Sequence, residues 1–588
     1  MGEVKNVVSA FLATAESLGN KPFVHYEADG LWQTLTWAQA RQRMLCLASK
    51  LREMGLKKGD RVIIYGQTSF DWALADFASL ANGAVVVPIY HSLTAKKVAE
   101  IIQEIKPTFA FIDSGSLISA WDKALSYADV QDDITVVCMG SSVDISNISS
   151  LSTVGEISDE IYSIIDSIKS SDHATYVYTS GTTGDLKAAV LTHGNLDGEI
   201  NGVGRVFLFK HEEKGLLWLP LAHVLGRMME FYAFVYGTET VFANDISRLP
   251  EIYIKQRPHF VSGVPRMLEK MYEGVEKKVD TLSGMKKRLF KWALEVGKDY
   301  GKSQRKHKGI GPMLVLKHRI AEYLVYRKIR AGLGGNLRHI ICGGAKLSEH
   351  IAGFFYAAGI QIIEGYGLTE TFAAATVNRM DDFRFGTVGK PIYGVDIKIA
   401  EDGEVLIKGS IVFSEYLGDP ESTKEAFTGD GWLKTGDLGE FTKDGFLRIT
   451  GRKKEIIVTA GGKNIAPQSI EFYLQKSAYV TNAVVYGDGK KYLVALMILD
   501  NEAVVQYLKK HGWYDGDKTP LYKNPAVERL IAEHVENQNK ELASYETIKR
   551  FSILEKPLSI EGGELTPTLK LRRKVIESKY QDVLDSLY

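Results

Sequence analysis

Cysteine is scarce in this sequence, since only Cys46, Cys138 and Cys342 occur among 588 residues. The three lie far apart and form no Cys-x-x-Cys pair, which argues against a disulfide framework and against a zinc knuckle. Each is expected to be a small buried hydrophobe and not a nucleophile. This cysteine usage fits a reducing compartment.

Net charge is also absent, because 72 Lys and Arg residues balance 72 Asp and Glu residues. Proteins that bind nucleic acid over a whole face are normally basic, so we expect no nucleic-acid partner. No apolar run approaches the length of a membrane span, and the N-terminus, with Glu3 and Glu16, lacks the apolar core of a signal peptide. Asn6 breaks the myristoylation pattern. These absences predict a cytoplasmic location.

Strand-like and helix-like segments alternate between residues 31 and 115. This β-α-β alternation predicts a layered α/β fold with mostly parallel strands. The length of the chain predicts more than one domain. The expected strands are Arg61–Tyr65, Ala84–Ile89 and Phe109–Ile112, and the expected helices are Thr36–Met54, Phe70–Asn82 and Leu93–Ile105.

A loop rich in Gly, Ser and Thr follows the expected strand His173–Tyr178. Gly181 and Gly184 allow a tight turn that aims backbone N–H groups inward, and Lys187 adds a positive charge. This chemistry suits a polyphosphate, although the glycine spacing is not that of a Walker A loop. An ordinary surface turn is the alternative. The hydroxyl donors are Thr179, Ser180, Thr182 and Thr183.

Two further glycine turns follow the expected strands Leu337–Cys342 and Ile360–Ile363. Open α/β sheets bind ligands at the carboxyl ends of their strands, where these turns would lie. In the second turn, EGYGLTET, Tyr366 offers a stacking face for adenine and Glu370 offers a hard oxygen ligand for Mg²⁺.

The segment from Val264 to Leu333 is helical in pattern and basic. Between residues 286 and 330 it holds fourteen Lys and Arg residues but only Glu295, Asp299 and Glu322 as acids. Basic amphipathic segments are typical of membrane-surface elements, so reversible contact with an anionic membrane surface is one hypothesis. A solvated helical hairpin is the other, and the two remain open.

Six motifs in this order resemble the adenylate-forming superfamily of acyl-CoA synthetases, luciferases and peptide-synthetase adenylation domains. The resemblance runs over about residues 20–580. The motifs are YTSGTTGDLK with LTH, LPLAHV, EGYGLTET, WLKTGD, GRKKE and LTPTLK. The basic helical segment, about residues 267–333, resembles the insertion of long-chain and bubblegum-type acyl-CoA synthetases. The chain departs from the family at Leu186, Ala188 and Val458, where proline, glycine and lysine are usual.

The resemblance implies a large N-terminal domain over residues 1–451 and a small mobile α+β domain over residues 452–588. Layered α/β subdomains and a β-rich subdomain would form the large domain. Lys454 would be the hinge pivot between the two domains.

The resemblance also implies the roles of individual residues. His223, Lys187 and Lys570 would act in the reaction, and Glu370 and Thr179 would act there too and hold Mg²⁺. Asp437 would bind the ribose, and Gly461–Asn464 would face coenzyme A. The implied contacts to ATP or coenzyme A are Thr179, Ser180, Gly181, Thr182, Thr183, Gly184, Lys187, Gly344, Ala345, Glu364, Gly365, Tyr366, Gly367, Thr369, Asp437, Arg452, Lys454, Gly461, Gly462 and Lys463.

The function implied by the resemblance is that of an AMP-forming long-chain fatty acid–CoA ligase, with fatty acid, ATP and coenzyme A as substrates. Two alternatives stay open: an adenylate-forming enzyme with a carrier-protein or other acceptor, and a non-catalytic acyl-binding or uptake protein. Arg227, four residues after His223, is interpreted as a gate or carboxylate partner beside an acyl tunnel, or as a surface arginine. A peripheral position on the inner face of a membrane accompanies the membrane hypothesis.

Overall fold

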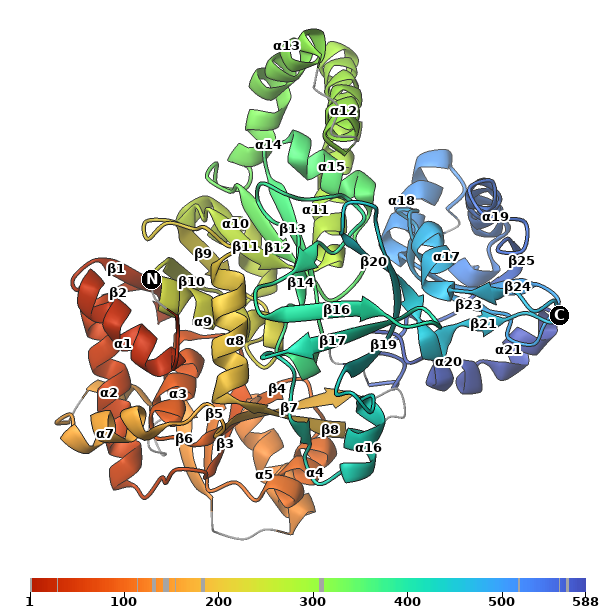
Figure 1. The fold of residues 1–588 in the computed structure, drawn as a ribbon. Coiled ribbons are helices and arrows are strands. Elements are labelled where there is room, and N and C mark those ends of the chain that lie inside the picture. Colours follow the sequence, from red (N-terminus) through yellow and green to blue (C-terminus); the bar gives the residue numbers. More distant parts are fainter. Residues whose placement is uncertain are drawn as a thin grey trace.

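The structure is a computed structural model in which two large sheets are stacked with helices, next to a β-rich layer and a small C-terminal part (Figure 1). This mixed α/β architecture is the fold class that the sequence predicts. The residues described are 3–28, 30–113, 115–129, 134–140, 148–153, 155–180, 186–305, 311–514, 516, 519–559, 561–566 and 570–588.

A seven-stranded sheet has the order β18-β8-β7-β4-β3-β5-β6. Strands β3 to β7 pair in parallel, whereas β8 and β18 are antiparallel. Parallel neighbours need helical crossovers, which explains the alternation in the sequence. The strands and helices expected between residues 36 and 113 are confirmed. The bounds are β3 Arg61–Gly66, β4 Val85–Tyr90, β5 Phe109–Asp113, β6 Thr135–Met139, β7 His173–Ser180, β8 Leu186–Thr192, β18 Glu415–Tyr416, α2 Trp37–Glu53, α3 Phe70–Ala81, α4 Ala95–Ile105 and α5 Ser116–Ala128.

A nine-stranded sheet has the order β15-β14-β13-β12-β11-β9-β10-β1-β2. Its centre is parallel, from β13 to β1, so the carboxyl ends of β12 and β13 lie at one edge. The bounds are β1 Pro22–Ala28, β2 Leu31–Thr36, β9 Lys214–Leu217, β10 Glu239–Phe242, β11 Phe260–Gly263, β12 His339–Cys342, β13 Gln361–Tyr366, β14 Thr376–Val377 and β15 Lys390–Pro391.

The two large sheets share a core. Val62 and Ile64 of β3 enter this central core, which also contains side chains of α1, α3, α8 and α9, whereas Ile63 packs on the opposite face with α4 and α5. The outer face of the nine-stranded sheet packs against α10 and α15. The three cysteines are buried free thiols, as expected. The bounds are α1 Val7–Leu18, α6 Ile148–Thr153, α7 Asp159–Ser167, α8 His193–Gly204, α9 Val224–Tyr236, α10 Leu249–Gln256 and α15 Glu349–Ala357.

The basic segment forms helices, as the sequence predicts, and α12 and α13 project beyond the rest of the molecule (Figure 1). Phe290 and Val296 of α12 pack against Val325 and Tyr326 in a small core of their own. No helix in the described part of the chain is long and apolar enough to cross a bilayer. The bounds are α11 Pro265–Asp280, α12 Gly284–Arg305, α13 Pro312–Ala321, the π-helical turn η2 Glu322–Tyr326 and α14 Arg327–Ala331.

A four-stranded antiparallel sheet of order β16-β17-β19-β20 precedes the C-terminal part. After it, two core clusters draw their buried residues from positions 457 to 584 alone. The bounds are β16 Val395–Ile399, β17 Glu404–Gly409, α16 Pro420–Ala426, β19 Leu433–Phe441, β20 Leu447–Arg452, β21 Ile457–Val458, β22 Asn464–Ile465, α17 Pro467–Leu474, β23 Val480–Tyr486, β24 Leu493–Leu499, α18 Asn501–His511, α19 Pro525–Asn539, β25 Ile548–Ile553, α20 Arg573–Lys579 and α21 Gln581–Ser586.

Candidate active site

Three side chains from two sheets meet around the carboxylate of Asp437. Asp437 on β19 and Arg452 on β20 are cross-strand partners, and the Arg452 Nε lies 2.9 Å from Asp437 Oδ1. The Tyr366 hydroxyl, at the end of β13, donates to Asp437 Oδ2 at 2.7 Å. The Asp437 side chain is 4% exposed but that of Arg452 is 42% exposed, so the cluster opens to solvent on one side.

Lys570, from the C-terminal part of the chain, lies near the same cluster. Its side chain is exposed to solvent, yet enough protein surrounds it to lower its pKa, and Arg452 lowers this pKa further. Asp437 and Glu370 act in the opposite direction. Lys570 is therefore within electrostatic reach of motifs that precede it by more than a hundred residues.

His223 caps the N-terminus of α9. Its Nδ1 accepts a hydrogen bond from the Leu225 N–H at 3.1 Å, and its ring lies edge-on to Tyr90 with 6.5 Å between centroids. Burial, with a smaller contribution from Lys570, lowers the pKa of His223 to about 4. The imidazole is consequently neutral at physiological pH.

The predicted phosphate loop connects β7 and β8, which form an antiparallel hairpin. Thr179 and Lys187 face each other across it, and the Thr179 hydroxyl donates to the Lys187 carbonyl at 3.3 Å. Lys187 Nζ lies 3.3 Å from Asp419 Oδ2 and also contacts Ser422. Gly181, Thr182, Thr183, Gly184 and the side chain of Ser180 lie outside the described residues.

Glu370 is oriented by a residue that the sequence analysis did not identify. The Tyr416 hydroxyl, on β18, donates to Glu370 Oε1 at 2.7 Å, and Lys187 Nζ lies 5.6 Å from the Tyr416 ring centroid. Tyr416 thus lies between the two predicted phosphate-side groups. No local pattern around Tyr416 signals this, because it lies 46 positions from Glu370.

Backbone geometry explains the glycines of the EGYG turn. A Cβ on Gly367 would lie 1.6 Å from the carbonyl oxygen of Ala373, so no larger residue fits without a shift. Gly365 and Tyr366 pair with β14, and Thr369 opens the short 3-10 helix η3 Thr369–Thr371. Unlike the residues that follow it in the turn, Glu364 is buried, which raises its pKa to about 8.

The turn after β12 lies open at the same sheet edge. Gly344 has a left-handed φ of 85°, no atom lies within 4 Å of the position that a Cβ would take there, and both Gly344 and Ala345 are exposed. Glu199 of α8, a second residue missed from the sequence, is fully buried and accepts a hydrogen bond from the Ala374 N–H at 2.8 Å. It therefore anchors the segment that follows η3.

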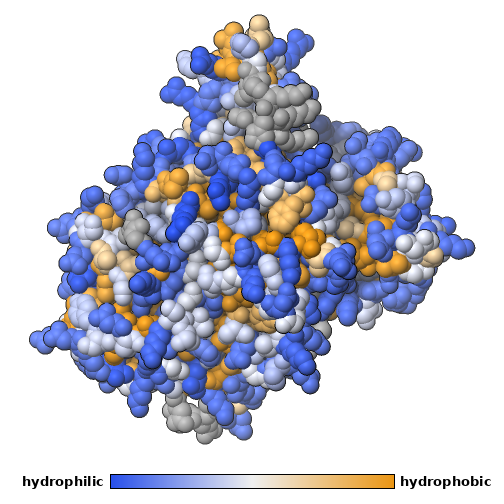
Figure 2. Space-filling model, viewed as in Figure 1, coloured by the Kyte–Doolittle hydropathy of each residue, from blue (hydrophilic) through white to orange (hydrophobic). Residues whose placement is uncertain are grey.

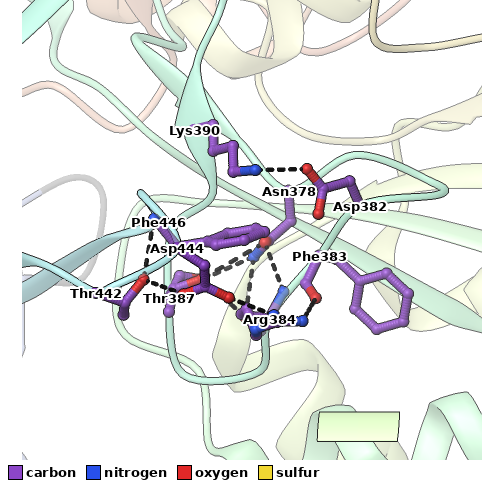
Figure 3. Close-up of polar contacts among 9 residues, drawn as sticks. All are labelled: Asn378, Asp382, Phe383, Arg384, Thr387, Lys390, Thr442, Asp444 and Phe446. Carbon is purple, nitrogen blue, oxygen red and sulfur yellow. Dashed lines mark hydrogen bonds and ion pairs between the residues drawn. The ribbon is translucent and has the colours of Figure 1, made fainter. Parts of the chain in front are cut away.

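A polar cluster fastens the loop after β14 to the turn between β19 and β20 (Figure 3). The Asn378 side chain donates to the Thr387 carbonyl at 2.7 Å and accepts from the Arg384 N–H at 3.0 Å. Arg384 in turn forms an ion pair with Asp444. Lys390 Nζ lies 4.5 Å from the Phe446 ring centroid. The cluster thereby links the loop after β14, which pairs with β13, to the hairpin that carries Asp437 and Arg452.

The predicted hinge and the predicted CoA-facing turn are exposed. Lys454 lies in the 3-10 helix η4 Lys453–Glu455, next to Lys453, which pairs with Asp402 and Glu404. Gly461, Gly462 and Lys463 form the turn between β21 and β22, and Lys463 Nζ lies 5.6 Å from the Tyr545 ring centroid. Val458 on β21 is 45% exposed.

Arg227 is neither a surface residue nor open to a tunnel, which corrects both interpretations made from the sequence. Its Nε and Nη2 donate to the two carboxylate oxygens of Asp76 at 2.7 and 2.5 Å, and Nη1 donates to Thr175 Oγ1 at 2.6 Å. The side chains of Arg227 and Asp76 are 1% and 0% exposed. Arg227 therefore ties α9 to α3 and β7, the elements beside His223 and Thr179.

No group of three or more His, Cys, Asp or Glu residues that could hold a metal ion occurs in the part of the chain that the structure describes. A single oriented carboxylate remains compatible with Mg²⁺, which commonly takes one or two carboxylates together with substrate phosphates and water. Glu370 is such a carboxylate.

Comparison with known proteins places these residues in context. The AMP-binding enzyme family matches residues 11–417, and the AMP-binding enzyme C-terminal domain matches residues 454–588. Long-chain-fatty-acid–CoA ligase FadD15 of Mycobacterium bovis is 37% identical over 597 residues, covering 100% of this chain and 98% of that protein.

Two solved structures share the fold. The Mycobacterium tuberculosis fatty acyl CoA synthetase aligns with a TM-score of 0.63 at 21% identity, over 98% of this chain and 99% of that chain. The adenylation domain of a carboxylate reductase from Mycobacterium chelonae aligns with a TM-score of 0.76 at 21% identity, over 99% and 91%.

Proposed function

The chain belongs to the AMP-binding enzyme family, and we propose that it is an AMP-forming ligase that joins a long-chain fatty acid to coenzyme A. The observation that carries this proposal is the cluster of Asp437, Arg452 and Tyr366, with Lys570 from the C-terminal part of the chain within electrostatic reach of it. The full-length similarity to a long-chain-fatty-acid–CoA ligase supports a long acyl chain as the substrate.

The chain forms two domains with different roles in the reaction, one over residues 1–451 and one over residues 452–588. The separate hydrophobic cores after residue 456 support this division. Lys454, exposed between the two, is the pivot.

The nucleotide lies against the carboxyl ends of β12 and β13 and against the middle of β19, where Asp437 is located. Asp437 accepts hydrogen bonds from the ribose hydroxyls, a role that suits a buried carboxylate, and Arg452 steadies it. Tyr366 stacks on adenine. Gly344, Ala345, Glu364, Gly365, Gly367 and Thr369 shape the surrounding backbone.

In the first half-reaction, a carboxylate oxygen of the fatty acid attacks the α-phosphorus of ATP. A phosphorus–oxygen bond forms to the acid, the bond to the bridging oxygen breaks, and pyrophosphate leaves. Residues 179–187, with Lys187, hold the outgoing phosphates, while the Lys570 cation stabilises charge at the α-phosphate. His223, neutral with its pKa near 4, orients the acid without adding charge.

Mg²⁺ would fit beside Glu370. Tyr416 fixes one carboxylate oxygen of Glu370, and Thr179 supplies a hydroxyl on the facing hairpin. When bound, the ion neutralises phosphate charge and aligns the phosphates for in-line displacement.

In the second half-reaction, the small domain turns about Lys454, Lys570 withdraws and residues 461–464 approach the acyl-adenylate. The thiol sulfur of coenzyme A attacks the acyl carbonyl carbon, the carbon–oxygen bond to AMP breaks, and the thiol proton passes to solvent. Exchange of catalytic surfaces by a hinge is a known mode of conformational change. The exposure of Lys454, Gly461 and Gly462 supports it.

We propose a cytoplasmic location with reversible contact between the basic helices and the inner face of a membrane. The excess of fourteen bases over three acids between residues 286 and 330 supports this contact.

The decisive test is CoA-dependent AMP formation from ATP with carboxylic acids of about two to twenty carbons. Each additional methylene changes the free energy of binding by about 1–3 kcal/mol. Turnover that peaks with long chains is expected. Pyrophosphate release without acyl-CoA would move the acceptor to another thiol, and absence of pyrophosphate release would leave only an acyl-binding role.

A further inference from the structure

Glu199 lies in the core of the molecule, although glutamate normally belongs at the surface, where Figure 2 shows many hydrophilic residues. Its side chain extends from α8, and Oε1 accepts a hydrogen bond from the Ala374 N–H at 2.8 Å, whereas Oε2 has no partner among the described residues. Burial raises the pKa of Glu199 well above its usual value of 4.5, so the carboxyl is neutral at physiological pH. A buried acid with a single hydrogen bond stabilises a core less than an apolar side chain does, which points to a role in the neighbouring site.

The two residues before Ala374 have a strained backbone. Phe372 has a φ of 52° and Ala373 has a φ of 148°, a range in which residues with a Cβ are rare. Ala373 does not end a helix, so its surroundings must hold it in this conformation. We call residues 372–374 the strained segment. The other non-glycine residues with positive φ in the described part of the chain each end a helix, where this conformation is common, and they are Lys106, Asp129 and Arg257.

The strained segment closes the turn that carries the groups that we propose for adenine and Mg²⁺. The Ala375 N–H donates to the Tyr366 carbonyl at 2.8 Å, so the turn is a closed loop with Glu370 inside it. The Ala373 carbonyl oxygen packs against Gly367, where a Cβ would lie 1.6 Å away from it. Rotation of the Ala373 peptide to a relaxed conformation would therefore move the backbone of the whole turn.

Two contacts hold the strained segment in this conformation. The Phe372 ring is fully buried and stacks on Phe231 of α9, with 5.8 Å between the ring centroids. The Glu199 carboxyl holds the other end through the Ala374 N–H. The first contact is apolar and has no preferred direction, whereas a hydrogen bond fixes the direction of a peptide group. The orientation of the peptide between Ala373 and Ala374 therefore depends on Glu199.

We propose that Glu199 is a positioning residue for acyl-adenylate formation, because it holds the strained segment, and through it Glu370, in the geometry that Mg²⁺ and ATP require. This inference rests on the proposed function, which assigns Glu370 to the metal. Glu199 is buried beneath the turn and acts only through Ala374. An uncharged acceptor is sufficient for this role, so glutamine can replace the glutamate, whereas a side chain without an acceptor cannot.

Four variants and one control separate this role from a general effect on stability. Glu199→Gln keeps the acceptor, and Glu199→Met removes it with little change in length. Ala373→Gly is made alone and together with Glu199→Met, since glycine adopts a positive φ without strain. The control is Glu230→Met, because Glu230 is a fully buried glutamate of α9 whose oxygens have no hydrogen-bond partner among the described residues.

Glu199→Met should slow pyrophosphate release at saturating ATP and Mg²⁺ about tenfold to a hundredfold, because Glu370 is displaced. The Mg²⁺ concentration for half-maximal rate should rise about tenfold, as is typical when the support of a metal ligand is removed. Glu199→Gln should stay within about twofold of the wild type in both quantities. Ala373→Gly should restore most of the rate that Glu199→Met loses, since the strained segment then needs no tether. Glu230→Met should leave the Mg²⁺ requirement unchanged.

Hydrogen exchange followed by mass spectrometry gives a readout that does not depend on catalysis. The peptide that contains residues 366–375 should exchange about tenfold faster in Glu199→Met than in the wild type, because the Ala374 N–H has lost its acceptor. Exchange of the same peptide should be unchanged in Glu199→Gln and in Glu230→Met. Urea midpoints of all variants report global stability.

Loss of rate in Glu199→Met without a rise in the Mg²⁺ requirement, or only in proportion to lost stability, overturns the proposal. Equal impairment of Glu199→Gln overturns it too, because the effect would then come from charge. Failure of Ala373→Gly to restore the rate would show that backbone strain is not the cause. If the wild type releases no pyrophosphate with any acid, the proposed function fails, while unchanged hydrogen exchange in Glu199→Met would separately refute the tether.

Discussion

Two aspartate–arginine pairs in this molecule make a similar contact between the arginine Nε and the carboxylate but lie in different surroundings. Arg227 Nε donates to Asp76 at 2.7 Å, and Arg452 Nε lies 2.9 Å from Asp437. The first pair is closed, with both side chains at most 1% exposed. In the second pair the aspartate is 4% exposed and the arginine 42% exposed. A ligand can reach only the second.

This difference separates a structural ion pair from a functional one. A charge in a closed site must keep its partner, because an unpaired buried ion bears the full desolvation cost. In a pair that is open to solvent, a ligand or water can replace part of the contact between the two ions, and the desolvation cost is much lower. Arg227 accordingly belongs to the scaffold that holds α9 against β7, whereas Asp437 and Arg452 belong to the proposed nucleotide site.

Substitution of Arg227 should give the largest effect, and on stability. Arg227→Ala leaves Asp76 buried without its cation, so the free energy of unfolding should fall by about 3–5 kcal/mol. Urea denaturation measures this loss. Arg379→Ala, at an exposed arginine of the same domain, should change stability by no more than about 0.5 kcal/mol. A loss of less than about 1 kcal/mol in Arg227→Ala would remove the contrast between the two pairs.

Lys570, which faces the open pair, should give the largest effect on catalysis. Lys570→Ala should slow acyl-adenylate formation about 10²–10³-fold, the range seen when one preorganised electrostatic group is removed. Conversion of supplied acyl-adenylate to acyl-CoA should change little, because Lys570 has left the site by then. The two half-reactions are followed by pyrophosphate release and by thioester formation. Equal losses in both would refute the role given to Lys570.

The pH dependence of adenylation should report the same lysine. The surrounding protein and Arg452 hold the pKa of Lys570 below its usual value of 10.5, and only the cation stabilises phosphate charge. Adenylation should therefore decline as pH rises through this lowered pKa, about tenfold per pH unit above it. Lys570→Arg should remove this alkaline limb, since arginine stays charged. An alkaline limb that persists in the arginine variant would assign it to another group.

The contrast between the pairs also marks what the sequence could and could not predict. The strands, helices and motif order followed from local pattern, because period and glycine turns are local properties. The resemblance predicts that the motifs share a site, and in the structure Asp437, Arg452 and Glu370 lie within electrostatic reach of Lys570. The burial of Arg227 was missed because its partner, Asp76, lies 151 positions away. The roles of Tyr416 and Glu199 were not predicted for the same reason, since only the folded chain brings these residues close to their partners.

Substitution of Asp437 or Asp76 by asparagine tests the comparison between the two pairs, because asparagine removes the charge and keeps nearly the same shape. Asp437→Asn should raise the KM for ATP about tenfold to a hundredfold, in line with about 1.5–3 kcal/mol for hydrogen bonds to a charged group, and leave stability nearly unchanged. Asp76→Asn should lower stability and leave the KM for ATP nearly unchanged, because Arg227 then stays buried beside a neutral amide. Steady-state kinetics and urea midpoints are measured on both variants. Similar losses of stability in the two variants would show that the solvent exposure of Arg452 does not lower the cost of losing its carboxylate partner.

The smallest effect is expected beside the proposed nucleotide site, where Tyr416 orients Glu370 through one hydrogen bond of 2.7 Å. Tyr416→Phe keeps the ring beside Lys187 but removes the donor, so adenylation should fall about twofold to tenfold, as the loss of about 0.5–1.5 kcal/mol implies. The concentration of Mg²⁺ needed for half-maximal rate should rise, since Glu370 is then less well placed. Tyr545→Phe, at a 47% exposed tyrosine near Lys463, should leave adenylation unchanged. If Tyr416→Phe alters stability and not the Mg²⁺ requirement, then Tyr416 belongs with Arg227 among the scaffold residues.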